Sequence, residues 1–411
     1  GPSLQRATGE GGAFLATLEL LDGHHVIGTV PLSHPRQGAL AGLCKTAALE
    51  WKGVTCRAFD AAADWKDNPR IAKIVVDALL HPSTSTPVEI GLQPSQAYQL
   101  KLESTEESAK EIRRLDLEDN DVVVVSGGAR GVTAAAVIEL ARTRPLTFIL
   151  LGRSPQPLDE PPWLHDLNDA AAIKQAIITN EFRHETPTPQ AVEALYKRLM
   201  HNREINATLA AVTAAGATAR YYAVDICDAP KLEAVIKDVR LVHGPVKALF
   251  HGAGVLQDRL IVDKTPEQFR LVFNTKVKGL QNLLQSTVDA PLRWIVLFSS
   301  VAARFGNIGQ ADYAAANEAL NKLAQSEAIK RNGCRIKSIN WGPWDGGMVS
   351  PALKKAFEHR GIPLISVKSG TRALIAEMDA ASDDAIEIVI GSELPPSATS
   401  DRLESLPPPA V

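Results

Sequence analysis

The chain has 411 residues and a formal net charge of −3. This length allows two or three domains with cores of their own, and the near-neutral charge without a basic block argues against a nucleic-acid partner. Four scattered cysteines form no CxxC pair, and no apolar run approaches the roughly 18 residues of a membrane span, so we expect no metal, no disulfide framework, no membrane and a cytoplasmic location.

The first part of the chain alternates short apolar runs with helical patterns. Strands are predicted at 13–21, 54–62, 87–93 and 97–103, and helices at 34–51 and 69–80. None of the turns between them is a glycine-rich phosphate loop. A charged connector then runs to residue 121, and we place a domain boundary inside it. We therefore expect a first α/β subdomain over 4–118 that binds no cofactor.

From residue 119 to 394, strand and helix patterns alternate as in a doubly wound parallel sheet. Strands are predicted at 122–126, 147–151, 219–224, 246–250, 294–299 and 335–340. An insert over about 155–215 interrupts this alternation, with prolines that indicate a helix start and Gly216 as its stop. We interpret the insert as one or two packed helices rather than as a binding element. The Pro-rich stretch 395–411 has the composition of a linker.

The segment SGGARGVT, at 126–133, follows a predicted strand and opens a predicted helix, the context in which a glycine loop binds a dinucleotide. Gly127 permits the tight turn, and Gly131 lets the backbone approach a pyrophosphate at the helix N-terminus. Thr133 stands where a third glycine is usual. The loop alone therefore leaves a cofactor site and a structural turn both open.

Two arginines favour NADPH as the cofactor. Arg130 lies inside the loop, and Arg153 follows the second strand of this part of the chain. A guanidinium at this strand end pairs with the 2′-phosphate of NADP, whereas an acid would bind the 2′-hydroxyl of NAD. One exposed arginine would be only a solvated charge, but two at these positions predict NADP(H).

The next two strand ends add an acid and small residues. Asp225 ends the third strand, where the adenine would lie, and HGAG at 251–254 leaves room for a flat cofactor, although each glycine alone would be only a turn. The expected cofactor-binding residues of these loops are Gly127, Gly128, Arg130, Gly131, Val132, Arg153, Ser154, Asp225, Ile226, Gly252, Ala253 and Gly254.

The segment FSSVAARFGNIGQADYAAAN carries Ser300 and, thirteen positions later, Tyr313 at a predicted helix start. This spacing resembles the active site of short-chain dehydrogenases/reductases, which place a lysine four positions after the tyrosine. Here that position is Asn317, and FNTKVKGLQNL supplies Lys276 instead. The exchange, with SGGARGVT, HGAG and NWGPW, resembles the ketoreductase domains of multidomain polyketide and fatty acid synthases.

The resemblance covers nearly the whole chain. It implies a doubly wound Rossmann catalytic subdomain preceded by a truncated Rossmann-like structural subdomain. It also implies NADPH-dependent reduction of a β-ketoacyl thioester on an acyl carrier protein, with other domains of the same synthase as partners. GGAFLATLELLDG, TPTPQAVEAL and REINATLAAVTAAG further resemble the ketoreductases of polyunsaturated fatty acid synthases and related iterative polyketide synthases.

The resemblance gives four residues catalytic roles. Tyr313 would donate the proton to the ketone oxygen, and Lys276 would lower the pKa of Tyr313 and hold the nicotinamide ribose, so both also belong to the cofactor site. Ser300 would hydrogen-bond the carbonyl oxygen, and Asn317 would keep the lysine and a water chain in place. Each residue alone has a structural explanation, as packing, a solvated face or a helix cap, so the prediction depends on the joint pattern.

Two further segments concern the substrate. An LDD motif after the fourth strand accompanies D-configured hydroxyl products in this family. The chain has LQD, which keeps Asp258, and it has Phe305 where the opposite class carries tryptophan, so we expect the D (3R) product. Asp258 could also be only a helix cap or a surface turn.

In NWGPWDGGMV, Trp344 and Met348 would touch the substrate, and the helical segment 350–361 would form a lid that Gly346 and Gly347 allow to move.

Two other functions stay open from the sequence. One is a catalytically silent ketoreductase kept as a scaffold, which would bind cofactor without turnover. The other is a free-standing short-chain alcohol dehydrogenase, which would prefer free ketones to carrier thioesters.

Overall fold

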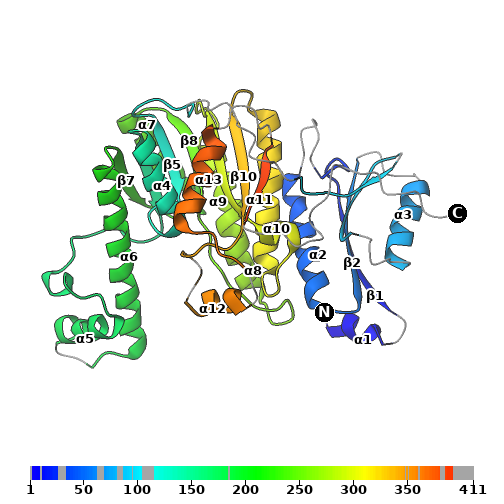
Figure 1. The fold of residues 1–411 in the computed structure, drawn as a ribbon, viewed down its shortest axis with the longest axis horizontal. Coiled ribbons are helices and arrows are strands. Elements are labelled where there is room, and N and C mark those ends of the chain that lie inside the picture. The colour runs from blue at the N-terminus through cyan, green and yellow to red at the C-terminus, as the bar shows by residue number, and fades with distance from the viewer. Residues whose placement is uncertain are drawn as a thin grey trace.

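Two sheets follow one another along the chain in the computed structural model (Figure 1). The described residues are 2–9, 12–25, 34–62, 69–80, 87–94, 96–103, 115–183, 186–347, 349, 351–359, 362–379 and 385–391. The predicted linker at 395–411 lies outside them. The predicted architecture, a doubly wound parallel sheet preceded by a smaller α/β unit, is confirmed. Among the described residues, no helix is both long enough and apolar enough to span a bilayer.

The first sheet has the order β1-β2-β3-β4, parallel except for the last pair. Its strands are β1 (Ala13–Glu19), β2 (Val54–Ala61), β3 (Glu89–Leu92) and β4 (Ala97–Tyr98). The strand predicted at 97–103 is too long, because only Leu92 and Gly91 of β3 lie beside it. The helices of this unit are α1 (Pro2–Ala7), the short η1 (Pro35–Gly38), α2 (Ala39–Glu50) and α3 (Pro69–Leu80).

The second sheet has seven parallel strands in the order β11-β10-β9-β8-β5-β6-β7. They are β5 (Val122–Ser126), β6 (Thr147–Gly152), β7 (Thr218–Ala223), β8 (Val246–His251), β9 (Trp294–Ser300), β10 (Arg335–Trp341) and β11 (Glu387–Ile390). The chain order reverses between β5 and β8. Because all the strands are parallel, their carboxyl ends meet at one edge, and ligands bind such sheets at the reversal point.

Helices cover both faces of the second sheet, which explains why its strands are apolar on both sides. One face packs against α4 (Gly131–Thr143), α6 (Pro189–Ala214) and α13 (Val367–Asp379). The other packs against α7 (Ala229–His243), α9 (Gly279–Ser286) and α11 (Ala311–Lys330). The remaining helical elements are η2 (Pro162–Leu164), α5 (Ala170–Glu181), α8 (Pro266–Phe273), η3 (Asn274–Lys278), α10 (Val301–Phe305) and α12 (Pro351–His359).

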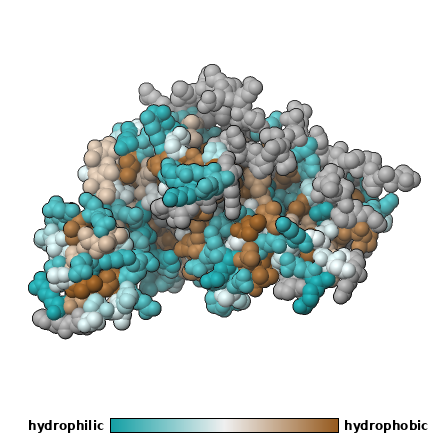
Figure 2. Space-filling model, turned by 60° about the horizontal axis from the view of Figure 1, so that its bottom comes forward, coloured by the Kyte–Doolittle hydropathy of each residue, from teal (hydrophilic) through white to brown (hydrophobic). Residues whose placement is uncertain are grey.

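The insert forms a helical arm built from α5 and α6. Thr188 caps α6 by accepting a hydrogen bond from the Ala191 N–H (3.2 Å), and Pro189 is its first residue. With 26 residues, α6 is about 39 Å long, roughly twice the length of the six-residue strands on either side. Its first half therefore projects past the sheet and packs on α5 (Figures 1 and 2).

The two units meet where α2 of the first packs on α11 of the second. A Cβ on Gly42 would lie 2.5 Å from the Ala314 carbonyl oxygen, so the two helices touch backbone to backbone. Ala314 directly follows Tyr313. The first unit therefore supports the helix that carries the predicted proton donor.

Candidate active site

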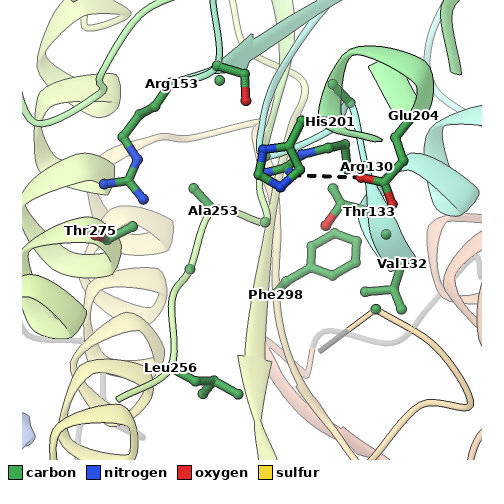
Figure 3. Close-up of a pocket in the computed structure, with 18 of the residues that line it drawn as sticks. Arg130, Val132, Thr133, Arg153, His201, Glu204, Ala253, Leu256, Thr275 and Phe298 are labelled. Carbon is green, nitrogen blue, oxygen red and sulfur yellow. Dashed lines mark ion pairs between the residues drawn. The ribbon is translucent and has the colours of Figure 1, made fainter. Parts of the chain in front are cut away.

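A cavity of about 1710 Å³ lies at the carboxyl ends of the second sheet's strands. Most small-ligand sites measure about 300–1,000 Å³, so this cavity has room for a dinucleotide together with a second molecule. The loops after β5 to β10 form its base, and α6 and α12 contribute its walls. Figure 3 shows part of this lining.

The glycine loop between β5 and α4 forms one part of the lining. Gly127 has φ +71° and Gly131 has φ +62°, left-handed values that favour glycine. A Cβ on Gly127 would lie 2.8 Å from the Ala253 nitrogen, so the turn and the loop after β8 are in close contact. The helix α4 begins at Gly131, and its first residues line the cavity. Its free N–H groups are suited to an anion.

Thr133 occupies space that a glycine opposite it provides. A Cβ on Gly252 would lie 2.3 Å from the Thr133 Oγ1 atom and 2.6 Å from its Cγ2 atom. Close packing between the helix and the sheet thus depends on a glycine in the loop after β8 instead of one in the helix. The departure from the usual glycine pattern is compensated within the site, so it does not argue against a cofactor loop.

Arg130 and Arg153 both line the cavity but point in different directions. The Nη1 atom of Arg130 lies 3.7 Å from the Oε2 atom of Glu204 on α6. Arg153 has no ion pair with a described residue, and its guanidinium turns toward Thr275, on the other side of Ala253 from Arg130 (Figure 3). The two predicted 2′-phosphate ligands therefore do not converge on one point.

The residues after β6 and β7 line the same side of the cavity as Arg153. The carbonyl of Ser154 accepts a hydrogen bond from the Tyr221 hydroxyl (2.8 Å), and the carboxylate of Asp225 accepts one from the Cys227 N–H (2.8 Å). The carbonyl of Ile226 accepts one from the Asn282 side chain (2.8 Å). These bonds fix the loops that border the cavity.

Ser300 and Tyr313 face the cavity from the end of β9 and the first turn of α11. The Ser300 hydroxyl oxygen caps α10 by accepting the Ala302 N–H (3.2 Å), which leaves its own proton for another acceptor. Burial raises the pKa of the Tyr313 phenol, although hydrogen bonds from Asn317 and Ser300 oppose this shift. The phenol therefore stays protonated near neutral pH.

Lys276 is buried in η3, a five-residue π-helical turn between α8 and α9. Such turns frequently mark functional sites. The ammonium donates a hydrogen bond to the Phe298 carbonyl (2.9 Å) and lies 5.5 Å from the centre of the Tyr313 ring. Burial lowers the pKa of Lys276 to about 7.

The backbone of Lys276 is fixed by a buried histidine. His251 Nε2 lies 2.9 Å from the Lys276 carbonyl oxygen, and its Nδ1 lies 2.7 Å from Ser126 Oγ. Burial and the nearby Lys276 charge lower the pKa of His251 to about 3, so the ring is neutral. We assign the proton to Nε2, which donates to the carbonyl while Nδ1 accepts from Ser126. A hydrogen-bonded chain thus links β5, β8 and the π-helical turn.

Asn317 is fully buried one turn after Tyr313 and does not line the cavity. Its amide nitrogen donates to the Tyr313 carbonyl (2.8 Å), and its own backbone carbonyl accepts the Ser299 hydroxyl (3.2 Å). Its Oδ1 atom is buried without a hydrogen-bond partner among the described residues. Buried polar atoms are rarely left this way, so Oδ1 is suited to a bound molecule.

The predicted stereocontrol residues divide between the cavity and its rim. Phe305 and Leu256 line the cavity. Asp258 is exposed outside it, and its carboxylate accepts a hydrogen bond from the Gln310 side chain (3.0 Å). Gln310 does line the cavity, so Asp258 can influence the cavity only by positioning the Gln310 side chain.

Trp344, which precedes the predicted lid, is buried against α13, where a Cβ on Gly370 would lie 2.2 Å from its ring. Gly347 packs against the end of the glycine loop, since a Cβ built on Gly347 would lie 3.0 Å from the Cγ1 atom of Val132. The next residue of interest, Met348, lies outside the described residues. The following helix, α12, contributes Leu353 and Phe357 to the cavity. The stretch after β10 thus borders the glycine loop through Gly347 and the cavity through α12.

Most of the predicted residues come together around this cavity. Those that line it are Gly127, Arg130, Gly131, Val132, Arg153, Ser154, Asp225, Ile226, Gly252, Ala253, Gly254, Lys276, Ser300, Phe305, Tyr313 and Trp344. Gly128 does not line it, because it is buried beneath the loop, where a Cβ would lie 2.4 Å from Val125.

Sequence reasoning missed the cavity-facing side of α6, which includes Lys197, His201 and Glu204. These residues recur at helical spacing, and the unusual length of the helix was a signal that it reaches past the sheet. Phe298, a buried residue of β9 that lines the cavity (Figure 3), was also missed, because an apolar residue in a buried strand looks like any core residue.

The fold and cavity together define a Rossmann-type domain with a reductase-like Ser, Tyr and Lys arrangement. Residues 122–346 match the model of the family described as KR domain. A protein of the polyunsaturated fatty acid synthase of a Thraustochytrium species is 36% identical over 378 residues, which are 89% of this chain and 13% of that protein. The chain belongs to the KR-domain family, the ketoreductase domains of polyketide and polyunsaturated fatty acid synthases.

Other matches agree with this family. Polyketide synthase PksL of Bacillus subtilis is 30% identical over 266 residues, 62% of this chain and 5% of that protein. A ketoreductase domain from the bacillaene assembly line superposes with a TM-score of 0.69 at 22% identity, covering 94% of this chain and 80% of that one. An N-terminal ketoreductase from the macrolactin assembly line gives 0.68 at 24% identity, covering 94% and 65%. The chain thus spans a small part of each synthase, and the structural matches show the fold.

Proposed function

We propose that this chain reduces a β-ketoacyl thioester, carried on an acyl carrier protein, to the D (3R) β-hydroxyacyl thioester with NADPH. The observation that carries the proposal is the meeting of Ser300, Tyr313 and Lys276 beside a glycine loop, in a cavity large enough for cofactor and substrate together. In this proposal residues 119–394 are the catalytic unit, residues 4–118 the structural unit, and the location is cytoplasmic.

The lining suits a nicotinamide dinucleotide. The left-handed glycines and the start of α4 would receive the pyrophosphate, while Arg130 and Arg153, on different sides of the cavity, each offer a guanidinium that could bind the 2′-phosphate that distinguishes NADPH from NADH. The small residues Gly252 to Gly254 would lie beside a flat ring system. Bound NADPH would supply the hydride that reduces the β-carbon.

Tyr313 would donate the proton that the ketone oxygen gains as it becomes a hydroxyl. Its raised pKa fits this role, because reduction requires the protonated phenol at the start. Ser300 would turn its hydroxyl proton, which now points to the Tyr313 phenol, to the same oxygen and donate a hydrogen bond while negative charge develops there.

Lys276 and Asn317 would act behind the tyrosine. The ammonium, 5.5 Å from the phenol ring, would stabilise the phenolate left after proton transfer and hold the nicotinamide ribose. The orphaned Oδ1 of Asn317 would accept a hydrogen bond from a water that relays a proton back to the site. The π-helical turn and the hydrogen bond from His251 would hold the Lys276 backbone in the position that this role requires.

The substrate's carrier and stereochemistry are the least direct parts of the proposal. The relatives of this chain are multidomain synthases, which favours a carrier-bound thioester over a free ketone. Asp258, Phe305, Trp344 and Met348 are proposed to orient the acyl chain for the D product. The closing of α12 over the chain would exclude water.

The decisive test follows NADPH oxidation with a short β-ketoacyl thioester, in parallel with NADH, for the wild type and Tyr313→Phe. We expect turnover with NADPH, and a loss of about 10²-fold or more in kcat for Tyr313→Phe, since general acid catalysis contributes about 10²–10⁴-fold. Tyr222→Phe is the matched control, because that hydroxyl bonds Asp238 outside the cavity (3.1 Å).

Chiral analysis of the product tests the D assignment. Turnover that survives Tyr313→Phe would refute the catalytic assignment. NADPH binding without turnover, on free and on carrier-bound thioesters alike, would favour the scaffold alternative. A preference for free ketones would favour the free-standing dehydrogenase.

A further inference from the structure

One side of α6 faces the part of the cavity that is bordered by the glycine loop and Arg153, which we call the cofactor end. Lys197, His201 and Glu204 lie on it at spacings of four and three residues, which places them on one face of the helix. The second half of α6 packs on α4 and β7, and the first half extends past the sheet's edge (Figure 1). The insert is therefore a wall of the cofactor site as well as an extension of a crossover.

This wall is fixed to the two loops that border the cofactor end. The Thr208 hydroxyl lies 2.9 Å from the carbonyl oxygen of Ala129 in the glycine loop and 2.9 Å from that of Glu204 in its own helix, so the two carbonyls share its proton. The Asn202 side chain bonds both the N–H (2.7 Å) and the carbonyl (2.6 Å) of Leu158, in the segment that follows Arg153. A helix held at both loops has a defined position relative to anything bound between them.

His201 is a polar side chain on this wall with free bonding capacity. It is half-buried, lines the cavity and makes no hydrogen bond to a described residue. Arg130 and Lys197 lie close enough that, together with burial, their charges lower the pKa of His201. Figure 3 shows its ring beside Arg130 and Glu204. Since the ring lies beside Arg130 and its N–H makes no hydrogen bond to a described residue, it is suited to donate to an anion.

Glu204 changes the charge balance at Arg130. Both members of this pair are exposed enough for solvent to weaken it, and their atoms lie at 3.7 Å. Arg130 is therefore held in place but partly neutralised, and Arg153 points elsewhere (Figure 3). Among the described residues, Lys197 is paired only with Glu193, at 3.5 Å on the surface of the helix. Arg130 alone, with part of its single charge offset by Glu204, does not balance a phosphate dianion.

We propose that α6 of the insert completes the 2′-phosphate site, with His201 and Lys197 joining Arg130 as phosphate ligands and Glu204 holding Arg130 until the phosphate replaces it. This inference rests on the proposed function, since it assigns the residues that select NADPH. It also gives the insert a role that a purely structural extension would not have.

The test measures the dissociation constants of NADPH and NADH by calorimetry at low salt. His201→Ala should weaken NADPH about 10-fold, because a hydrogen bond to a charged group is lost, and Lys197→Gln should weaken it less. Glu204→Gln should tighten NADPH about 3-fold, with the gain shrinking at high salt. NADH affinity should stay within about 2-fold throughout, which also reports that each variant is folded.

Lys237→Gln is the matched control, because it removes one positive charge from exposed α7 outside the cavity. If His201→Ala leaves NADPH affinity unchanged, or weakens NADH equally, α6 does not read the 2′-phosphate and the inference fails. That result leaves the proposed function intact as long as the wild type still binds NADPH more tightly than NADH. A wild type that does not prefer NADPH overturns the cofactor assignment itself.

Discussion

At the scale of single residues, Thr133 and Gly252 show how one departure from a motif is compensated by a partner distant in sequence. The third position of the glycine loop normally lacks a side chain so that helix and strand can approach. Here the side chain is present on α4, and the missing Cβ is on the loop after β8. The helix and the sheet still pack closely at this point, but the glycine that allows it lies in the loop after β8 and not in α4.

This pairing predicts a specific rescue. Gly252→Ala would force its Cβ into Thr133, 2.3 Å from Oγ1, so we expect a loss of about 1–3 kcal/mol in the free energy of unfolding and weaker NADPH binding. Adding Thr133→Gly should recover most of the NADPH affinity. Both quantities are measured by denaturant unfolding and by titration.

Gly391→Ala is the control for this experiment. No atom of the described residues lies within 4 Å of a Cβ built there, so the substitution should change stability by less than about 0.5 kcal/mol. If the double variant binds NADPH no better than Gly252→Ala alone, the two residues are not a compensating pair.

At the scale of secondary-structure elements, the difference between prediction and structure lies in length and position rather than in type. The strands β5 to β10 were predictable, and most clearly β5 and β6, because the residues of VVVVS and TFILL are buried on both faces of the sheet. Two features were not. The edge strand β11 is only half-buried, so its pattern is weak, and the π-helical turn at Lys276 has no known sequence signal.

The insert was interpreted from the sequence as a packing element, and it also proves to be a wall of the cavity. Periodicity predicts that a segment is helical, but it does not show what the helix reaches. Only the three-dimensional position of α6, fixed by the Thr208 and Asn202 hydrogen bonds, brings His201 beside Arg130. The same reason explains why Asp258, predicted near the substrate, lies on the rim.

The attachment of α6 to the glycine loop can be tested on its own. Thr208→Val keeps the shape of the side chain but removes the hydroxyl that lies 2.9 Å from both the Ala129 and the Glu204 carbonyl oxygens, and only the first of these contacts reaches the glycine loop. A neutral hydrogen bond contributes about 1 kcal/mol, so we expect NADPH and NADH to bind about 5-fold more weakly, and equally so. This differs from His201→Ala, which should affect NADPH alone.

Thr213→Val is the matched control on the same helix, because its hydroxyl bonds only Leu209 within α6 (3.0 Å) among the described residues. The variant should bind both cofactors as the wild type does. Equal effects from Thr208→Val and Thr213→Val would show that helix stability, and not the loop contact, is responsible.

At the scale of the whole molecule, a buried cluster of charges joins the cofactor-free unit to the catalytic one. Glu318 on α11 pairs with Arg304 on α10, with Lys322 (3.0 Å) and with Lys45 on α2 (3.5 Å). Lys45 in turn pairs with Glu89 of β3 (3.0 Å). Glu318 directly follows Asn317, and Arg304 precedes Phe305. The first unit thus helps to fix α10, which carries Phe305, and α11, which carries Tyr313 and Asn317.

Removing the central carboxylate should therefore be costly. Burial alone would raise the pKa of Glu318, but Arg304, Lys322 and Lys45 outweigh it and hold the pKa at about 2. Glu318→Gln leaves three buried cations with less compensation, so we expect a loss of about 3–5 kcal/mol in the free energy of unfolding at pH 7. Glu139→Gln, which removes an exposed pair with Arg142 (2.9 Å), should cost less than about 1 kcal/mol.

The loss of stability in Glu318→Gln could come from the lost charge or from poorer packing of the glutamine, and its dependence on pH distinguishes the two. Because the folded pKa of Glu318 lies below that of an unfolded glutamate, its contribution is fully present above about pH 4.5 and is lost as the pH falls toward 2. The stability gap between wild type and Glu318→Gln, measured by denaturant unfolding, should therefore narrow below pH 4.5. A gap that stays constant with pH would mean that Glu318 stabilises the junction by shape alone, and that the charge cluster does not couple the two units.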